Sequence, residues 1–317
     1  MKRIPRSQAL CYELDFRLEP VLHVKEGESF EVETEDAASG RLTSEATPPT
    51  LEHRPELKAW PARVNPVAGP IHVEGARPGD VLAVKVEDIE VPEQGLTWIR
   101  PGLGPLGDSK RWMGDVDAFT RVLRHEPGPS GTRRDGRVRM GSLSWPVMPF
   151  LGTLATAAER HVPTSGWGQG PFGGNLDVRD FAPGNTVLLN VYQPGALLFV
   201  GDVHASQADT EYTGTADEIR SVVRLSCTVI PEKRLPAPRV LKKDSIVFLG
   251  IDRPLEAAVE RAMKALLEWL TGERGVDKRD ACLLTSVHSE LRVHVYQMVP
   301  GSGLDYVAGV EFPAAGP

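Results

Sequence analysis

Cysteine is scarce in this sequence, and long apolar runs are missing. The three cysteines, Cys11, Cys227 and Cys282, are far apart and form no CxxC pair. Neither a disulfide framework nor a cysteine-ligated zinc site is therefore expected. No stretch approaches the roughly 18 consecutive apolar residues that cross a membrane, and the basic start, MKRIPR, is not followed by the apolar segment of a secretory signal. We therefore expect an unexported protein of the reducing cytoplasm.

Blocks of like charge are also absent. Acidic residues number 43 and basic residues 36, which gives a formal net charge of −7, and the two signs are interspersed along the chain. A protein that binds nucleic acid or an anionic membrane usually carries a basic patch or segment. We therefore expect neither nucleic acid nor a membrane among the partners of this protein.

Proline and glycine are abundant instead, with 27 and 31 residues among 317. They divide most of the chain into short runs, as is typical of many strands joined by turns. Apolar and polar residues alternate over 80–91 and again over 219–229, which indicates half-buried strands. The segments 21–36 and 186–202 each predict two further strands. The first two thirds of the chain should therefore be rich in β-structure.

The pattern changes after the proline-containing segment 230–240, IPEKRLPAPRV. Apolar residues at helical spacing predict a helix over 254–271, with Asp252 as its cap and Gly272 at its end. A shorter helix should begin at Asp277, before an alternating strand over 291–298.

These patterns predict an α+β fold that is mainly β. We expect an antiparallel sandwich-like or barrel-like body over 1–235, which would carry the functional site. A smaller α+β unit should follow over 236–317.

The richest cluster of metal-ligand side chains is GDVHASQADTE, residues 201–211, directly after an apolar run. Asp202 and His204 are two residues apart, so they should face the same side of a strand. Asp209 and Glu211 form a second pair, and a turn between the pairs would fold one over the other. Such nitrogen and oxygen ligands suit zinc or a similar divalent ion. The alternative interpretation is a solvated hairpin with a polar tip.

A second candidate segment is GPFGGNLDVRD, residues 170–180. Gly173 and Gly174 would let the backbone approach a ligand closely, while Asn175 and Asp177 offer oxygen ligands or hydrogen-bond partners. Glu74, in RVNPVAGPIHVEGARPGD, is a further candidate for binding a substrate. The alternative for both segments is a set of ordinary turns rich in glycine, asparagine and aspartate.

Together these segments resemble the acetamidase/formamidase family, whose members hydrolyse small amides and release ammonia. The resemblance extends over most of the chain and is carried by VLHVKEGESFEVETEDA, NPVAGPIHVEGARPGDVLAVKVEDI, TWIRPGLGPLGD, PVMPFLGTLATA, FGGNLDVRDFAPGNTVLLNVYQPGALLFVGDVHASQADTEYTGTADE and LLTSVHSELRVHVYQMVP. The fifth of these segments is the most specific. The resemblance implies a mostly β architecture, a divalent metal and a homo-oligomer, commonly a dimer.

Metal-assisted hydrolysis of a linear amide would assign a role to each candidate residue. Asp177, Asp202 and His204 would hold the metal, for which zinc is favoured and calcium is the alternative. Either Glu211 or Asp209 would act as the general base that takes a proton from water. The substrate would be a small linear amide, bound by Gly173, Gly174, Asn175 and Glu74.

Four residues depart from the family pattern. The key stretch usually reads GD-x-HAAQGDGE, so Ala208 and Thr210 replace two glycines. Phe172 and Asn65 stand where relatives often have histidines. These differences favour the competing hypothesis, a non-catalytic or substrate-shifted relative that binds a metal or a small molecule on the same scaffold.

Overall fold

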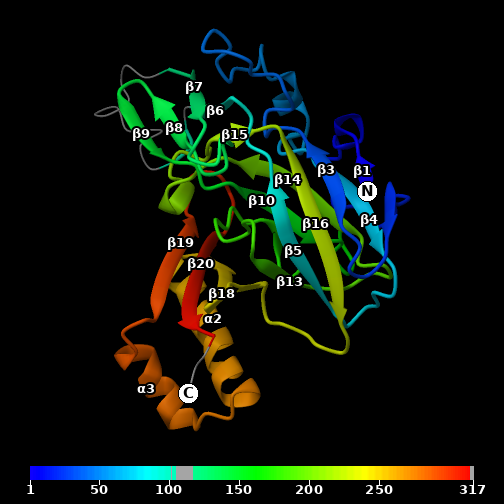
Figure 1. Cartoon of the computed structure of the whole chain (residues 1–317), viewed down its shortest axis with the longest axis vertical. Helices are drawn as coiled ribbons and strands as arrows, with labels where there is room; N and C mark the ends of the chain where they lie inside the picture. The colour runs from blue at the N-terminus through cyan, green and yellow to red at the C-terminus, as the bar shows by residue number, and fades with distance from the viewer. Residues whose placement is uncertain (101, 105–116, 315–317) are drawn as a thin grey trace.

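Antiparallel strands dominate the computed structural model, which describes residues 1–100, 102–104 and 117–314. The TWIRPGLGPLGD segment lies partly outside the described residues. Within these residues the fold consists of two large sheets and, near the end of the chain, two α-helices (Figure 1). The predicted fold class, α+β and mainly β, is confirmed.

The first sheet has nine strands, and all of its pairs are antiparallel except that of β1 with β3. In order across the sheet, the strands are β1 (Lys2–Ile4), β3 (Phe30–Thr34), β16 (Ser221–Ile230), β5 (Val81–Ile89), β13 (Thr186–Asn190), β17 (Arg239–Leu241), β18 (Ser245–Asp252), β20 (Tyr306–Pro313) and β19 (Arg292–Gln297).

The second sheet has eleven strands and carries most of the candidate site. Its main path runs through β11 (Gln169–Gly170), β12 (Gly173–Asn175), β10 (Phe150–Thr156), β14 (Leu198–His204), β15 (Glu218–Ile219), β6 (Gln94–Ile99), β7 (Phe119–Glu126), β8 (Arg137–Met140) and β9 (Leu143–Pro146). β4 (Val67–Val73) pairs with β14, and β2 (Leu22–Val24) pairs with β4 in parallel.

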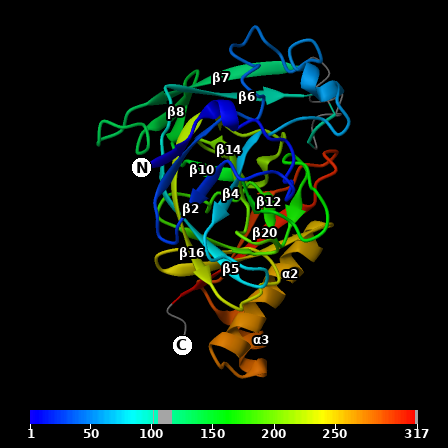
Figure 2. The same cartoon turned by 90° about the vertical axis from the view of Figure 1, so that its right-hand side faces the viewer.

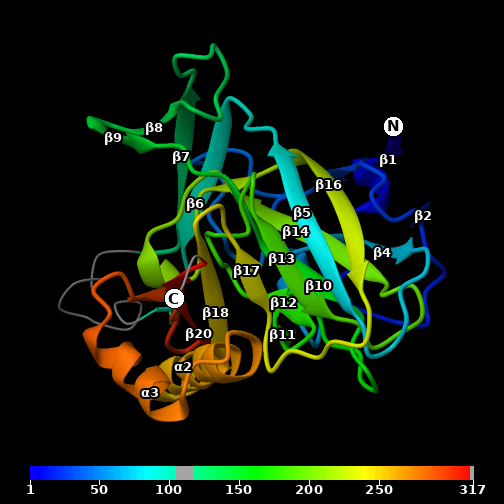
Figure 3. The ribbon, with the colours of Figure 1, turned by 60° about the horizontal axis from the view of Figure 1, so that its bottom comes forward.

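The main core lies between the two sheets. β5 and β16 of the first sheet lie over β10 and β14 of the second (Figures 2 and 3). One apolar cluster joins fully buried side chains from all four strands, including Val84, Leu225, Leu154 and Val200. Every residue of β14 is buried, which explains why its first residues, Leu198 to Gly201, are apolar without alternation, whereas Asp202 and His204 are buried polar residues at its end.

The two helices are α2 (Leu255–Glu268) and α3 (Lys278–Val287). A π-helical turn, η4 (Trp269–Glu273), continues α2, so the helix does not end at Gly272 as predicted. The prediction that Asp252 caps α2 is wrong. Pro254 occupies the cap position, and the Asp252 carboxylate pairs with Arg261 instead. Short 3₁₀ helices are η1 (Arg6–Gln8), η2 (Pro55–Lys58) and η3 (Asp209–Glu211).

The second helix begins where the sequence predicts. Asp277 precedes α3, and its side chain accepts a hydrogen bond from the backbone N–H of Arg279.

The first sheet continues across the predicted division between 1–235 and 236–317. β13 pairs with β17, with Val187 opposite Val240, so the C-terminal strands extend the same sheet. No helix in the described part of the chain is both long and apolar enough to span a bilayer.

Candidate metal and active site

Three of the site's five acidic and histidine side chains lie on the paired strands β14 and β15, and the other two come from connecting segments. Asp202 and His204 are two residues apart on that strand, and both are buried. β15 pairs with β14 so that Glu218 lies opposite His204. Glu211 follows at the end of η3 in the connection between these strands. Asp177 comes from the loop after β12, the neighbour of β10 in the same sheet.

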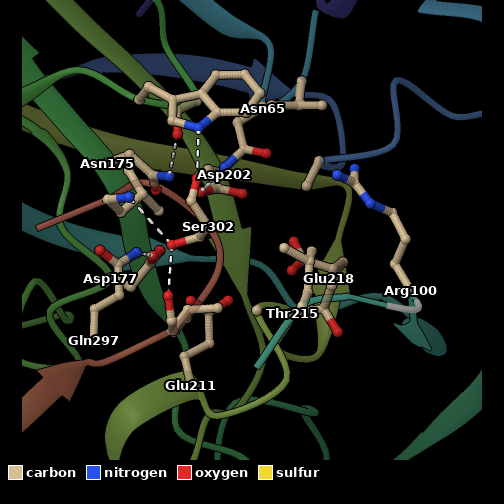
Figure 4. Close-up of a pocket in the computed structure, with 18 of the residues that line it drawn as sticks. Asn65, Arg100, Asn175, Asp177, Asp202, Glu211, Thr215, Glu218, Gln297 and Ser302 are labelled. Carbon is tan, nitrogen blue, oxygen red and sulfur yellow. Dashed lines mark hydrogen bonds between the residues drawn. The ribbon is translucent and has the colours of Figure 1, made fainter. Parts of the chain in front are cut away.

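The five side chains form two overlapping groups of metal-ligand atoms. Asp202, His204 and Glu218 make one group, and Asp177, His204 and Glu211 make the other. Within each group the ligand atoms lie within 4.8 Å of one another. The Nε2 atom of His204 is 3.2 Å from Glu218 Oε2 and 3.5 Å from Asp202 Oδ1. The carboxylates face a shared cavity in Figure 4.

Four of these atoms are buried without a hydrogen-bond partner among the described residues: Asp177 Oδ1, Asp202 Oδ1, His204 Nε2 and Glu218 Oε2. Leaving a buried polar atom unsatisfied costs about 1–3 kcal/mol, and more for a charged group. The four atoms fit a divalent cation, because one imidazole nitrogen and several carboxylate oxygens form a donor set that zinc accepts. Calcium prefers oxygen ligands, so the imidazole favours zinc.

The imidazole of His204 is oriented by Gln207. Its Nδ1 atom lies 3.1 Å from Gln207 Oε1, a carbonyl oxygen that accepts the Nδ1 hydrogen. The lone pair of the neutral ring then lies on Nε2, the atom that faces Asp202 and Glu218. Phe150 supports the ring from the side, with an edge-on contact between ring centroids 5.0 Å apart.

Burial and mutual repulsion raise the pKa values of the carboxyl groups. Burial raises the pKa of Glu211 well above its usual value, and the neighbouring Asp177 raises it further. Burial and then Asp202 raise the pKa of Asp177 to about 7. Burial also raises the pKa of Glu218. A bound dication would stabilise the ionised carboxylates and so oppose these shifts.

Desolvation would lower the pKa of His204, but Glu218 and Asp202 outweigh it and raise that pKa well above its usual value. Glu218 and Asp202, which raise the affinity of His204 Nε2 for a proton, would therefore bind a metal ion together with that nitrogen.

Amide side chains hold two of the carboxylates in place. Asn65 Nδ2 donates to Asp202 Oδ2 over 2.8 Å, and Thr153 Oγ1 donates to the same oxygen over 3.2 Å. Gln297, at the end of β19, donates to Asp177 Oδ2, and its own carbonyl oxygen accepts a hydrogen bond of 2.6 Å from Gln169. Each aspartate therefore keeps one oxygen bonded and the other free.

Four residues of the site have left-handed backbone conformations without being glycine. The φ angles are 51° for Asn65, 49° for Asp177, 56° for Asp202 and 47° for Glu211. This region is sterically costly for residues with a Cβ atom, and asparagine and aspartate tolerate it best. The chain accepts this local strain at the points that aim side chains into the cavity.

The carboxylates lie at the floor of a cavity of about 130 Å³. A cavity of roughly 150 Å³ can hold one benzene molecule, so this volume suits a small organic molecule. Its polar lining includes two guanidinium groups, hydroxyl groups and amides. Among the lining residues are Asn65, Arg100, Trp167, Asn175, Asp177, Asp202, Glu211, Thr215, Glu218, Gln297 and Ser302.

The structure brings most of the predicted site residues together. Asp177, Asp202, Glu211 and Asn175 line the cavity, and His204 contacts the carboxylates from behind. Asp209 does not join them, because its exposed carboxylate pairs with Arg179.

Three predicted substrate-binding residues do not line the cavity. Glu74 is exposed after the end of β4, and the antiparallel register places Ile71 opposite Leu198, at the start of β14. Gly173 and Gly174 are packed between strands. A Cβ atom on them would lie 2.2 Å from the Leu154 carbonyl oxygen and 1.9 Å from that of Gly168. These glycines therefore permit close strand packing rather than contact with a ligand.

Glu218 and Gln297 were missed as site residues in the sequence. Glu218 belongs to a strand of two residues, too short for a periodic pattern, although it lies in the GTADE end of the most specific segment. Gln297 lies 120 residues after Asp177, so only the packing of β19 reveals it.

The departures from the family pattern have different structural consequences. Asn65 contacts the site directly through Asp202. Phe172 is buried in a separate apolar cluster with Leu14 and Phe199, so it contributes nothing to the cavity lining. Thr210 has φ 77°, a conformation that favours the glycine expected there.

Gly152 is packed closely against Asp177 and Asp202, with no room for a side chain. A Cβ atom added to it would lie 2.6 Å from Asp177 Oδ1, 2.9 Å from Asp202 Oδ2 and 2.7 Å from the Asp202 carbonyl oxygen. Gly152→Ala should therefore displace both carboxylates, lower the free energy of unfolding by about 1–3 kcal/mol and weaken the affinity of the two ligand groups for a divalent ion such as zinc. Denaturant unfolding and zinc titration would measure both effects.

Gly272→Ala is the matched control, because a Cβ atom there meets nothing within 4 Å. If Gly152→Ala bound zinc as tightly as the wild type does, this would contradict the idea that Asp177 and Asp202 bind the same ion.

Comparisons with known proteins support the resemblance to the acetamidase/formamidase family. The model of the acetamidase/formamidase family matches residues 15–165 and 149–304. The crystal structure of an acetamidase from Bacillus halodurans is 29% identical with a TM-score of 0.84, covering 98% of this chain and 97% of that one. An acetamidase structure from Yersinia enterocolitica is 30% identical with a TM-score of 0.83, covering 98% and 91%.

A putative formamidase of Schizosaccharomyces pombe is 25% identical over 258 residues. That alignment covers 65% of this chain and 60% of the yeast protein, so this chain spans less than two thirds of that relative's length. The family model nevertheless extends over most of the sequence. The chain therefore belongs to the acetamidase/formamidase family.

Proposed function

We propose that this protein hydrolyses the C–N bond of small linear amides, with ammonia and a carboxylate as products. The observation that carries the proposal is the set of four buried, unsatisfied ligand atoms beside a small cavity. The names of the similar proteins, acetamidase and formamidase, support the same reaction.

The proposed ion is zinc, held by Asp177, Asp202, His204 and Glu218. When bound, such an ion would polarise an amide carbonyl and lower the pKa of a bound water far below that of bulk water, toward ~7. An amide needs this help because its carbonyl is a weak electrophile and neutral water is a weak nucleophile. This ligand set retains the three predicted residues and adds Glu218, whose Oε2 atom is equally unsatisfied.

Glu211 is the proposed general base. It lines the cavity beside Asp177, and its own oxygens are not among the unsatisfied atoms. A carboxyl group with a raised pKa is suited to accepting a proton from water and returning it to the leaving amine. Asp209 is a weaker candidate because it is exposed and paired with Arg179.

Other lining residues would position the substrate. The Asn175 amide and the Thr215 hydroxyl line the same cavity as Glu211. One Asn175 N–H is donated to the Gly166 carbonyl oxygen, which leaves the second for a substrate carbonyl. The Thr215 hydroxyl donates to the Trp98 carbonyl oxygen, so it can only accept from a substrate amide N–H. Gln297 fixes the orientation of the Asp177 carboxylate, which keeps the neighbouring Glu211 in a defined environment.

The resemblance further supports a homodimer, which light scattering of the purified protein would test. The few, widely separated cysteines support a cytoplasmic location.

Metal analysis combined with an amidase assay tests the proposal. Purified full-length protein should contain a stoichiometric divalent ion and should release ammonia from formamide, acetamide or propionamide. Chelation should abolish ammonia release, and added zinc should restore it, because the ion supplies several kcal/mol of the transition-state stabilisation. Bound metal without ammonia release from any amide would favour the non-catalytic relative. Neither metal nor activity would refute the proposed function.

A further inference from the structure

An apolar groove lies next to the reaction cavity. Its volume is about 780 Å³, against about 130 Å³ for the cavity itself. Ligand sites for drug-sized molecules usually measure roughly 300–1,000 Å³, so the cavity alone is small and the groove is not. Most of the groove lining is apolar, and its members include Pro49, Leu51, Leu57, Ala59, Trp60, Pro61, Ala62, Ala118 and Trp167.

The groove and the cavity share part of their walls. Arg100, Trp167 and Ser302 line both spaces. The indole N–H of Trp167 donates to the Ser302 carbonyl oxygen over 3.1 Å, which holds this shared wall in a fixed position. A molecule that reaches the carboxylates through this junction therefore passes between a fixed aromatic ring and a guanidinium group.

Large apolar side chains of the groove are exposed to water. Trp60 is 98% exposed and Leu51 is 53% exposed. An exposed tryptophan beside a cavity offers a flat apolar face whose burial by a ligand is favourable by about 25 cal/mol per Å². Apolar surface gathered beside a cavity marks a binding site more often than an isolated exposed leucine does.

Together these observations identify the substrate class, given the proposed function. We propose that the preferred substrate is a primary amide with an apolar acyl substituent about the size of a phenyl ring. The amide group would lie in the cavity, and the acyl substituent would pass Arg100 and Trp167 into the groove against Trp60 and Leu51. Acetamide and formamide would fill the cavity but leave the groove empty.

The test compares three amides in the metal-loaded protein. Acetamide fills the cavity, phenylacetamide adds an apolar ring, and succinamate adds a carboxylate that Arg100 would pair with. We expect kcat/KM for phenylacetamide to exceed that for acetamide by about 10-fold or more, since a single methylene in an apolar pocket is worth about 10- to 200-fold. Trp60→Ala should lower this phenylacetamide-to-acetamide ratio by about 10-fold, and Trp60→Phe should retain most of it.

Leu143→Ala is the matched control, because Leu143 is also an exposed apolar residue, 59% exposed, but lies on β9 outside the groove. Its ratio should equal that of the wild type.

Each other outcome overturns the inference in a distinguishable way. Hydrolysis of acetamide with a ratio below one, unaffected by Trp60→Ala, would refute the apolar substrate and leave the proposed function intact. A preference for succinamate would show that Arg100 selects an anionic amide instead. If Trp60→Ala alters the molar mass by light scattering and not the ratio, a second copy of the chain covers the groove. Absence of hydrolysis of all three amides would refute the proposed function itself.

Discussion

Replacing His204 with alanine is expected to abolish both metal binding and amide hydrolysis. The imidazole Nε2 atom is the only nitrogen among the four unsatisfied ligand atoms, and a neutral imidazole is a strong zinc donor. Losing the ion would remove several kcal/mol of transition-state stabilisation, so kcat/KM should fall by about 10³-fold or more. Metal analysis of the purified variant and an ammonia-release assay would measure the two losses.

His125→Ala is the matched control for this variant. His125 is also buried, at 3% exposure, but it hydrogen-bonds the Pro92 carbonyl oxygen and Asp217 rather than the cavity carboxylates. The His125→Ala variant should have a lower free energy of unfolding than the wild type but the same metal content. Full metal content in His204→Ala would show that the carboxylates alone hold the ion.

Replacing Glu211 with glutamine is expected to leave metal binding largely intact while turnover is lost. Glutamine keeps the shape of the side chain but cannot accept a proton at neutral pH. Proton transfer by a positioned general base is worth about 10²- to 10⁴-fold, so kcat should fall within that range. Zinc affinity and kcat should be measured on the same preparation, because the argument depends on separating the two.

Asp209→Asn provides the comparison, since Asp209 lies two residues away but is exposed and paired with Arg179. It should retain most activity. Equal metal loss in Glu211→Gln and His204→Ala would make Glu211 a ligand. Activity lost only in Asp209→Asn would make Asp209 the base.

Much of the fold could be predicted because burial leaves a local pattern in the sequence. Leu82, Val84 and Val86 are fully buried while Lys85 is exposed, so β5 could be recognised from alternation alone. The first half of β14 could be recognised from its apolar run, since Leu198 to Val200 are buried on both faces of the strand. The continuity of the first sheet through β13 and β17 could not be predicted, because strand pairing leaves no signal in either strand.

The site could be predicted only where its residues lie close together in the sequence. Asp202 and His204 share a strand, so their spacing placed them on the same side. The register between paired strands determines which other residues lie beside them. The antiparallel pairing of β4 with β14 puts Val67 opposite Gly201, which brings Asn65 to Asp202 and takes Glu74 away from it. Glu218 and Gln297 also reach the site through pairings that only the structure reveals.

Because the backbone is left-handed at Asp177, Asp202 and Glu211, selection for thermal stability and selection for function favour different residues at these positions. Glycine would adopt these φ angles without steric cost, and removing a carboxylate would relieve repulsion inside the cavity. Selection for thermal stability alone would therefore favour substitutions that remove the proposed metal ligands and the proposed general base. A laboratory evolution programme that raises the melting temperature of this protein has to screen for function in every round, because its easiest stabilising routes lead through the loss of the site.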